Sequence, residues 1–280
     1  MRLGFVDHHL ENYHANVFLE LIRTAFADRG IEVIGYESDP AAGPDWCEQH
    51  QVRRAESIEA LVDQVDAILI LAPDDIGTHR GFAEAAIRGA RPVVFDKLLA
   101  ETVEDAERIA ELARRHDAPV LSSSALWYAA ELAELRADDA PVESAFARGF
   151  GAWDHYGIHT LAMAARLGGS GVRRALEAGT AEDRLLVLDY GDRRVTVDCR
   201  TGANAADELG WSAGVRVGGE WRVTKISDYA GFYRRTLAAY LDFCAGAGAD
   251  QGLDQALELV RLHAAADRSL AAGGSWVDLG

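Results

Sequence analysis

The first 124 residues alternate short apolar runs with segments of helical periodicity. This alternation constrains the fold more than any other feature, because a strand–helix repeat favours a parallel sheet with helices on both faces. Such a sheet binds its ligand at the carboxyl ends of its strands. The apolar runs that we predict as strands are residues 3–6, 31–36, 67–72, 92–97 and 119–122. We therefore expect residues 1–124 to form an α/β domain.

The second half of the chain has a different pattern. A predicted strand at residues 142–150 is followed by an apolar helix at 157–169 and then by short alternating runs. The alternating runs are residues 185–190, 193–200, 213–218 and 220–226. Such runs, separated by glycine and aspartate, are typical of an antiparallel sheet, and two helical patterns at 229–244 and 253–270 follow them. We expect residues 125–280 to form an α+β domain with an open-faced, mainly antiparallel sheet.

The net charge of the chain limits the classes of molecule that it is expected to bind. It has 45 acidic and 28 basic residues, a formal net charge of -17 at pH 7. A surface of this sign repels nucleic acid and anionic lipid, so we expect a small-molecule partner, no nucleic acid and no membrane. The sequence shows no targeting leader, and no run approaches the roughly 20 apolar residues that span a bilayer. Because its three cysteines are also far apart, we expect a cytoplasmic protein without a disulfide framework.

Three motifs, in order along the chain, carry a resemblance to a known family. APDDIGTHRGFAEAAIRGARPVVFDKLLAETVEDAERI, residues 72–109, contains a strand, a loop, a helix and a second strand that ends in Asp96-Lys97-Leu98. HYGIHTLAMAARLGG, residues 155–169, opens a helix, and the chain ends in two helices and the tail SLAAGGSWVDL. The order resembles that of the Gfo/Idh/MocA oxidoreductases over nearly the whole chain. The family usually has Glu-Lys-Pro at the first motif and aspartate at the position of His155, so the sequence departs from the family pattern there.

The resemblance implies a Rossmann-like domain that binds NAD or NADP, followed by an open-faced sheet domain. In the family the active site lies between the two domains, and a sugar, a cyclitol or a related hydroxy compound is commonly oxidised there. Members often pair through the exposed face of the sheet, so the resemblance also implies a homo-oligomer. We therefore expect an NAD(P)-dependent oxidoreductase that acts on a CH–OH group.

Lys97, His159 and His155 are the expected catalytic residues. Lys97 ends a predicted parallel strand, so its ammonium can face the ligand and ease deprotonation of a hydroxyl. The resemblance implies that His159 exchanges a proton with that hydroxyl, which suits an imidazole with an ordinary pKa of about 6.5. His155 precedes His159 by four residues and could share the proton work. The alternatives are a surface lysine paired with Asp96 and a buried structural histidine.

Other residues are expected to contact the cofactor or the substrate. Pro73, His79 and Asp96 are expected to contact the cofactor. The resemblance implies that a histidine near the position of His79 borders it. A surface helix cap is the alternative for His79. The residues expected at the substrate are Trp127, Asp154 and Tyr156. Both aromatic residues of this set could equally belong to the core.

The loop after the first strand lacks the glycines that a dinucleotide-binding turn normally has. When the loop is aligned with the family's Gly-x-Gly-x-x-Gly motif, the three glycine positions are occupied by Asp7, His9 and Asn12. Glycine allows a tight turn there and lets backbone amides approach the pyrophosphate. A carboxylate about 4 Å from a phosphate would cost up to about 4 kcal/mol at an effective dielectric constant of about 20. Binding is therefore weakened unless Asp7 turns away, a cation intervenes or the pyrophosphate shifts toward His8 or His9.

Glu37 ends the second predicted strand, where an acidic residue often binds the adenine ribose. Its carboxylate would accept hydrogen bonds from both ribose hydroxyls and would repel a 2'-phosphate. We therefore expect NAD to be preferred over NADP. A solvated loop carboxylate is the alternative.

Two other functions are compatible with the same fold. A set of histidines and one aspartate would gather near one cleft, where it could hold a divalent metal or transfer protons in a lyase or an isomerase. The members of this set are Asp7, His9, His14, His79, His155 and His159. His14 lies on the apolar stripe of its helix and is expected to point inward. The other possibility is a ligand-binding or accessory protein without redox chemistry.

Overall fold

The protein consists of two compact units. The computed structural model describes residues 1–280 except 41–44, 73–75, 138–139, 202–209, 250 and 280. The first unit comprises Met1–Ser123 and Tyr233–Leu257, and the second comprises Ser124–Phe232 and Glu258–Gly280. The first unit thus contains a segment from near the C-terminus in addition to its N-terminal part.

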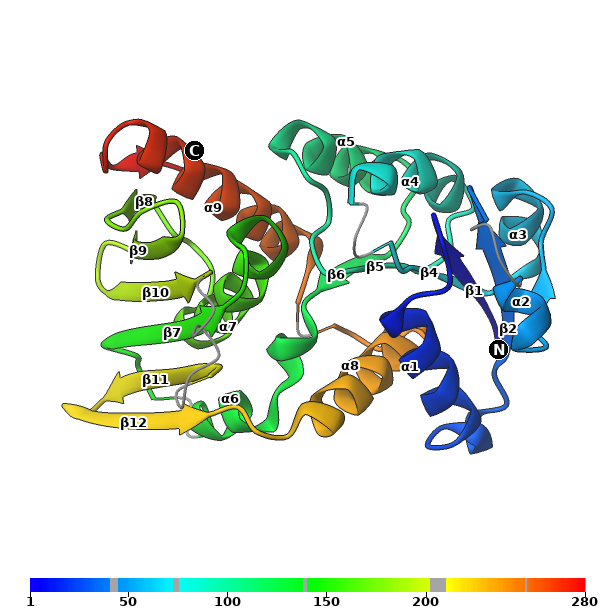
Figure 1. The fold of residues 1–280 in the computed structure, drawn as a ribbon, viewed down its shortest axis with the longest axis horizontal. Helices are drawn as coiled ribbons and strands as arrows, with labels where there is room; N and C mark the ends of the chain where they lie inside the picture. Colours follow the sequence, from blue (N-terminus) through cyan, green and yellow to red (C-terminus); the bar gives the residue numbers. More distant parts are fainter. Residues whose placement is uncertain (41–44, 73–75, 138–139, 202–209, 250, 280) are drawn as a thin grey trace. The chain divides into compact units, whose positions relative to one another are not determined.

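The first unit is built on a six-stranded sheet in which every strand pair is parallel (Figure 1). The strand order is β3-β2-β1-β4-β5-β6. The strands are β1 (Arg2–Asp7), β2 (Glu32–Glu37), β3 (Arg53–Arg54), β4 (Ala67–Ile70), β5 (Val93–Asp96) and β6 (Val120–Ser123). The predicted parallel sheet is confirmed, and β3, which the sequence did not predict, is only two residues long. In the register of β1 and β2, Asp7 is paired with Glu37, so the carboxyl ends of these strands lie side by side.

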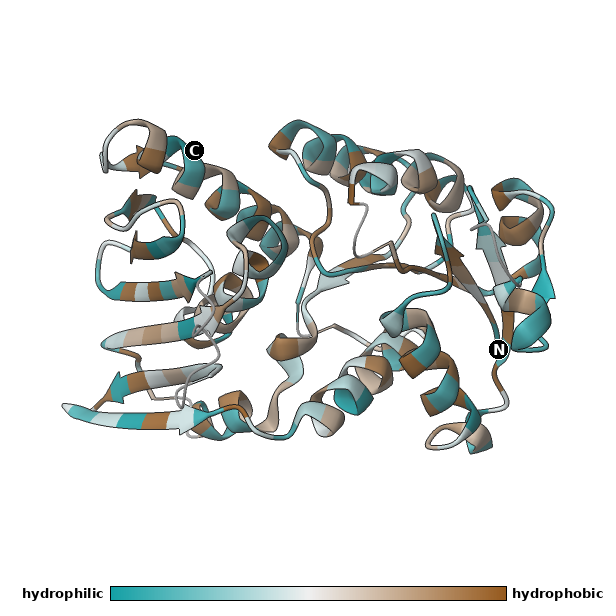
Figure 2. Ribbon diagram, viewed as in Figure 1, coloured by the Kyte–Doolittle hydropathy of each residue, from teal (hydrophilic) through white to brown (hydrophobic). Residues whose placement is uncertain are grey.

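Helices lie on both faces of this sheet (Figure 1). α1 and the first-unit part of α8 lie on one face, while α3, α4 and α5 lie on the other. The helices are α1 (Tyr13–Arg23), α2 (Trp46–Gln49), α3 (Ile58–Gln64), α4 (His79–Arg88), α5 (Val103–Arg115) and α8 (Tyr229–Cys244), with short turns at Ala27–Arg29 and Ile76–Thr78. The central strands are largely apolar (Figure 2), and every residue of β4 is buried, as expected for a strand covered on both faces.

The second unit is built on a seven-stranded sheet of order β12-β11-β7-β10-β9-β8-β13. β7 and β10 are parallel, and the other pairs are antiparallel. The strands are β7 (Ser144–Phe150), β8 (Arg174–Glu177), β9 (Asp183–Asp189), β10 (Arg194–Arg200), β11 (Ser212–Val217), β12 (Glu220–Lys225) and β13 (Val277–Asp278). The predicted second fold, an open-faced and mainly antiparallel sheet, is confirmed. Buried residues alternate with half-buried ones along β7, because helices cover only one of its faces.

The helical segments of the second unit surround the central helix α7, which packs on β7, β10 and β11. They are a short 3-10 helix (Ala125–Tyr128), α6 (Ala130–Leu135), a π-helix (Trp153–Gly157), α7 (Ile158–Gly168) and the second-unit part of α9 (Leu253–Ala271). In the part of the chain that the structure describes, no helix is both long and apolar enough to cross a membrane.

Gly149 allows α7 to approach the sheet closely. A Cβ atom on this residue of β7 would lie 2.1 Å from Thr160 Oγ1 and 2.2 Å from the Trp211 ring. Both neighbours are buried, so neither can move aside cheaply. The absence of a side chain at Gly149 therefore sets the distance between α7 and β7.

Gly149→Ala should destabilise the protein by about 1–3 kcal/mol, because it overpacks a filled core. The free energy of unfolding in urea would measure this change. Gly81→Ala is the matched control, since Gly81 lies in α4 and a Cβ there would have no atom within 4 Å. The control should be as stable as the wild type or more stable by up to about 1 kcal/mol. Equal stability of the two variants would contradict this view of the packing.

Candidate functional site

The loop between β1 and α1 has no need of glycine. All of residues 7–12 are described, and none of them has a positive φ. Asn12 caps α1, because its Oδ1 accepts hydrogen bonds from the amides of His14 (3.0 Å) and Ala15 (3.1 Å). Its Nδ2 donates to Asp7 Oδ2 and to His9 O, both at 2.8 Å. One side chain thus links the strand, the loop and the helix.

Asp7 is turned into the loop and away from solvent. Only 3% of the residue is exposed, and its carboxylate accepts hydrogen bonds from His9 N (3.2 Å) and Asn12 Nδ2. Burial raises the pKa of the Asp7 carboxyl to about 7, and the nearby charge of Asp96 adds to this shift. The repulsion of a phosphate that the sequence predicted is therefore smaller than it would be for a carboxylate in the groove.

Glu37 is also buried, and both of its carboxylate oxygens accept hydrogen bonds. Leu10 N donates to Oε1 at 2.8 Å, and Arg54 binds Oε2. Arg54 binds Asp45 as well, at 2.7 Å. The side chain expected to bind a ribose therefore anchors the loop to the end of β2, and Arg54 and Asp45 are partners that sequence patterns did not reveal.

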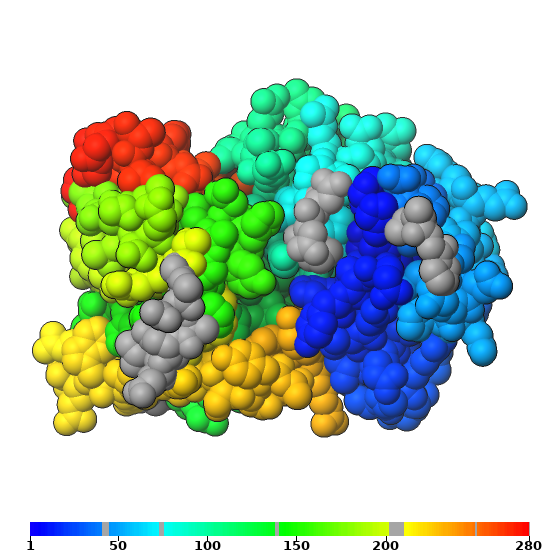
Figure 3. Space-filling view, in the orientation of Figure 1, coloured from blue at the N-terminus to red at the C-terminus, as the bar shows by residue number. Residues whose placement is uncertain are grey.

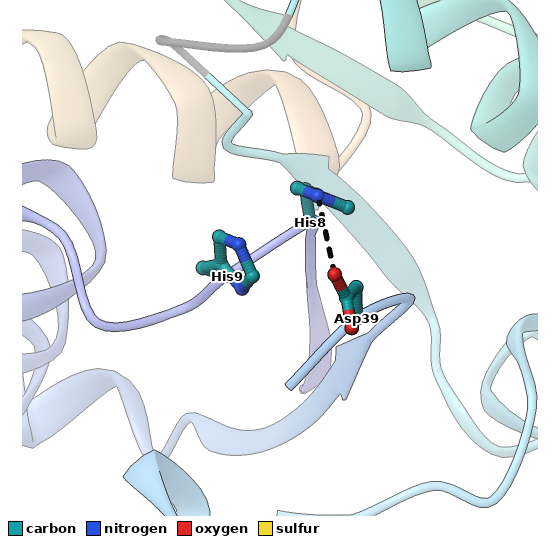
Figure 4. Close-up of side chains that lie close together, drawn as sticks. All are labelled: His8, His9 and Asp39. Atoms are coloured by element: carbon teal, nitrogen blue, oxygen red, sulfur yellow. Dashed lines mark ion pairs between the residues drawn. The ribbon is translucent and has the colours of Figure 1, made fainter. Parts of the chain in front are cut away.

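Two histidines and an aspartate lie together at the ends of β1 and β2 (Figure 4). His8 Nε2 is 3.8 Å from Asp39 Oδ2, and the His8 and His9 ring centroids are 4.3 Å apart. His8 Nδ1 also forms a hydrogen bond with Ser38 Oγ at 3.0 Å. His8, His9 and Asp39 offer ligand atoms within 4.8 Å of one another, a spacing that could hold a metal ion. This set shares only His9 with the histidine cluster that the sequence suggested, because His8 and Asp39 were not part of that cluster.

A second group of possible metal ligands, Glu37, Asp45 and Cys47, lies nearby. Arg54 already binds both of its carboxylates. A guanidinium between the two acids supplies the positive charge that a cation would bring. This second group is therefore a salt-bridge cluster.

Asp96 and His14 form a buried pair at the end of β5. Asp96 is 1% exposed, and its Oδ2 is hydrogen-bonded to His14 Nδ1. The ring of Tyr233, from α8, packs edge-on against His14 with the centroids 5.6 Å apart. His14 thus points inward as expected, and Asp96 ties α1 to the sheet.

Lys97 has an unusual backbone conformation for a lysine, with a φ of 66° in the left-handed region. Hydrogen bonds hold this conformation, from Lys97 N to Ser123 O (3.1 Å) and from Ser122 Oγ to Lys97 O (2.8 Å). Leu98 is 4% exposed. A proline at its position would restrict the backbone of residue 97, so leucine there is compatible with the observed turn.

His79 is completely buried at the start of α4. Its Nε2 is 3.1 Å from Ala72 O and its Nδ1 is 3.3 Å from Leu99 O, so it connects the segments that follow β4 and β5. Burial lowers the pKa of the His79 imidazole from its ordinary value of 6.5. Pro73, the other residue expected here, lies outside the described residues.

His79 should make the protein less stable as the pH falls below 6.5. Its folded-state pKa is lowered, so in acid the unfolded chain takes up a proton that the folded chain does not. As the pH falls below 6.5, the wild type should lose unfolding free energy relative to His79→Gln, by at most about 1.4 kcal/mol per pH unit. Urea unfolding of both proteins between pH 5 and pH 8 would measure it. Parallel pH profiles would contradict a buried neutral imidazole.

In the second unit, a π-helix holds three of the predicted residues at the surface. Asp154, His155 and Tyr156 are exposed. A Cβ on Gly157 would lie 2.4 Å from the Trp153 ring, so the glycine lets this turn close over a buried tryptophan. π-helical turns are frequent at functional sites, and sequence periodicity does not reveal them.

His159 follows at the start of α7, where its Nδ1 is hydrogen-bonded to Ser124 Oγ at 2.7 Å. Trp211 packs edge-on against its ring with the centroids 6.0 Å apart, and the Tyr156 ring lies at 5.8 Å. Ser124 and Trp211 were not predicted, because only the fold brings them to His159. Trp127 is 3% exposed under the guanidinium of Arg166, so it is a core aromatic residue.

The predicted site residues therefore lie together in two groups. The first unit brings together Asp7, His8, His9, Asn12 and Glu37 at the ends of β1 and β2. The second unit brings together His155, Tyr156 and His159 around the π-helix. Lys97 belongs to the first unit and His159 to the second. The roles assigned to these residues stay predictions.

Solved structures share this fold along the whole chain. A probable dehydrogenase from Thermotoga maritima is 14% identical, with a TM-score of 0.81, covering 100% of this chain and 99% of that chain. A myo-inositol dehydrogenase from Corynebacterium glutamicum is 12% identical, with a TM-score of 0.80 and coverage of 100% and 99%. An oxidoreductase from Agrobacterium radiobacter, in complex with NAD+, L-tartaric acid and magnesium, is 16% identical, with a TM-score of 0.76 and coverage of 100% and 98%. The fold is thus that of two-domain dehydrogenases.

Residues 9–123 match a family model described as an oxidoreductase family with an NAD-binding Rossmann fold, GFO_IDH_MocA. The matched residues begin in the loop after β1 and end with β6. No curated protein matches the sequence. This match covers less than half of the chain, and it agrees with the family predicted from the three motifs.

Proposed function

We propose that the protein is an NAD(P)-dependent oxidoreductase that acts on the CH–OH group of a sugar, a cyclitol or a related small hydroxy compound. The observation that carries this proposal is the match of residues 9–123 to an NAD-binding oxidoreductase domain. In this chain Lys97 directly follows β5 within the matched residues. The similar structures include a myo-inositol dehydrogenase and a complex with NAD+, which supports the same class of reaction.

The ends of β1 and β2 would hold the dinucleotide through contacts unlike those of a glycine-rich turn. Four backbone amides of the loop and of the first turn of α1 donate to side chains. These amides belong to His9, Leu10, His14 and Ala15. The imidazoles of His8 and His9 are then the side-chain donors that would meet the pyrophosphate. Asp7, Asn12 and Glu37 would shape the loop that carries them.

Lys97 and His159 would handle the proton while the bound cofactor accepts hydride from the carbinol carbon. Lysine is rare in this chain, which has two lysines, Lys97 and Lys225, among its 28 basic residues. An ammonium can lose its proton far more readily than a guanidinium, which explains a lysine at such a position. The hydrogen bond between Ser124 Oγ and His159 Nδ1 orients the ring, and Nε2 would exchange the proton with the substrate. Exposed His155, Asp154 and Tyr156 would contact the substrate.

Purified protein should bind NADH and should reduce NAD+ in the presence of a polyol from a panel that includes myo-inositol. Fluorescence titration and NADH absorbance would measure the two properties. Lys97→Ala and His159→Ala should each lower kcat by about 100-fold or more, because each removes a general acid–base group. Lys225→Ala, the only other lysine substitution that the chain offers, should keep full activity. Absence of NADH and NADPH binding at millimolar concentration would reject the proposal.

NADH should bind more tightly than NADPH. Asp39 places an exposed carboxylate just after β2, where a 2'-phosphate would lie, whereas the Glu37 carboxylate is buried and paired with Arg54. A repulsion of about 1–3 kcal/mol corresponds to a preference of about 5–150-fold. Fluorescence titration with both cofactors in EDTA would measure the ratio, and Asp39→Asn should reduce it. Equal affinities in the wild type would show that the Asp39 carboxylate does not select the cofactor.

The expected homo-oligomer and cytoplasmic location stay predictions. The uncovered face of the second sheet would supply an interface. Val223, Gly214, Phe146, Thr196 and Val187 stand opposite one another on neighbouring strands β12, β11, β7, β10 and β9. Val223 is 62% exposed, and Trp221 on the same strand is 50% exposed. The three apolar side chains of this row, Val223, Phe146 and Val187, support association between copies of the chain.

A further inference from the structure

His8 and His9 lie on the same side of the chain although they are consecutive. Successive side chains of a strand point to opposite faces, so two neighbours cannot meet while the strand continues. Here β1 ends at Asp7, and the Asp7 carboxylate accepts a hydrogen bond from His9 N, which bends the chain at this point. The result is a pair of imidazoles whose centroids are only 4.3 Å apart.

The backbone of the adjacent strand holds Asp39 beside this pair. Two hydrogen bonds extend the parallel pairing beyond the strand ends, from Ser38 N to Asp7 O (3.1 Å) and from Asp39 N to His8 O (3.3 Å). Asp39 therefore follows β2 at a fixed position with respect to His8. Figure 4 shows the two imidazoles and the carboxylate around a common space.

The side chains present the right atoms to this space. Ser38 Oγ is hydrogen-bonded to His8 Nδ1, and His8 Nε2 is 3.8 Å from Asp39 Oδ2. Nδ1 of His9 is buried and has no hydrogen-bond partner. An outer partner that fixes the ring orientation, as Ser38 does, is typical of histidines that bind metal ions.

We propose that His8, His9 and Asp39 bind a divalent first-row transition metal ion. Two imidazoles and a carboxylate are ligands that suit zinc and its neighbours, whereas magnesium and calcium prefer oxygen ligands. Ligand atoms about 2.1 Å from one tetrahedral ion lie roughly 3.4 Å apart, so the atoms of this site need only small side-chain rotations. The three residues leave at least one coordination position for water or an anion.

The location gives the ion a function that goes beyond the proposed redox reaction. Phosphate groups bind at the carboxyl ends of parallel strands, but here two amides of the loop and two amides of the first turn of α1 already donate to side chains. A divalent ion here restores positive charge at that position and offers a phosphate oxygen a ligand site. Residues near the N-terminus, dark blue in Figure 3, lie at the surface. The side chains of His8 and Asp39 are 31% and 71% exposed, so the ion has a route from solvent.

The test uses the full chain without a His-tag, stripped of metal with EDTA, dialysed and titrated with CoCl2. Bound Co2+ should give visible absorption bands that saturate at one equivalent, and ZnCl2 should displace it. His8→Ala, His9→Ala and Asp39→Asn should each weaken binding by more than tenfold. Ser38→Ala, which loses the outer partner of His8, should weaken binding by about tenfold. Circular dichroism would establish that each variant is folded.

His116→Ala is the matched control, because this histidine lies at the end of α5 in the same unit. The control should bind Co2+ like the wild type. Absence of binding at millimolar CoCl2, or binding that His8→Ala and Asp39→Asn leave unchanged, would overturn the proposal. NADH affinity measured in EDTA tests the proposed function separately, so the failure of one proposal is distinguishable from the failure of the other.

Discussion

The hydrogen bonds of the Asn12 side chain hold the N-terminal site together. Its oxygen caps α1 and its amide nitrogen binds Asp7 and His9 O, so one residue closes the turn that glycines close in other dinucleotide-binding folds. A left-handed backbone is not needed, because side-chain hydrogen bonds supply the bend. The buried carboxylates of Asp7 and Glu37 follow from the same arrangement, since each accepts an amide of the loop.

This arrangement changes how the sheet can meet an anion. Amides that usually face a phosphate are occupied, while His8, His9 and Asp39 lie at the carboxyl ends of β1 and β2. The fold keeps the position of a dinucleotide site but replaces backbone donors by imidazoles, which can donate hydrogen bonds or bind a metal ion. After the end of β5, Lys97 has a left-handed backbone conformation. Its hydrogen bonds with Ser122 and Ser123 of the neighbouring strand β6 offset the cost of this unfavourable φ.

Local patterns were sufficient for most of the fold. Buried apolar runs predicted the parallel strands, alternating runs predicted the antiparallel ones, and α8 was predicted with its observed ends. Some short elements were not predicted, because two to six residues carry too little periodicity; among them are β3, β8, β13 and α6. The π-helix before α7 escaped for another reason, since it depends on the contact between Gly157 and the Trp153 ring.

The sequence by itself determined the class of fold, the family motifs and the positions of Lys97 and His159 near element ends. It could not determine which side chains meet, since partners such as Asp39, Arg54 and Ser124 come from distant segments that pair only when the sheets form. It also could not show that Asp7 turns inward, because the free energy that orients a carboxylate comes from burial and from donors in three dimensions. Periodicity is a local property of the chain, whereas hydrogen bonding and desolvation in a site are properties of the folded arrangement.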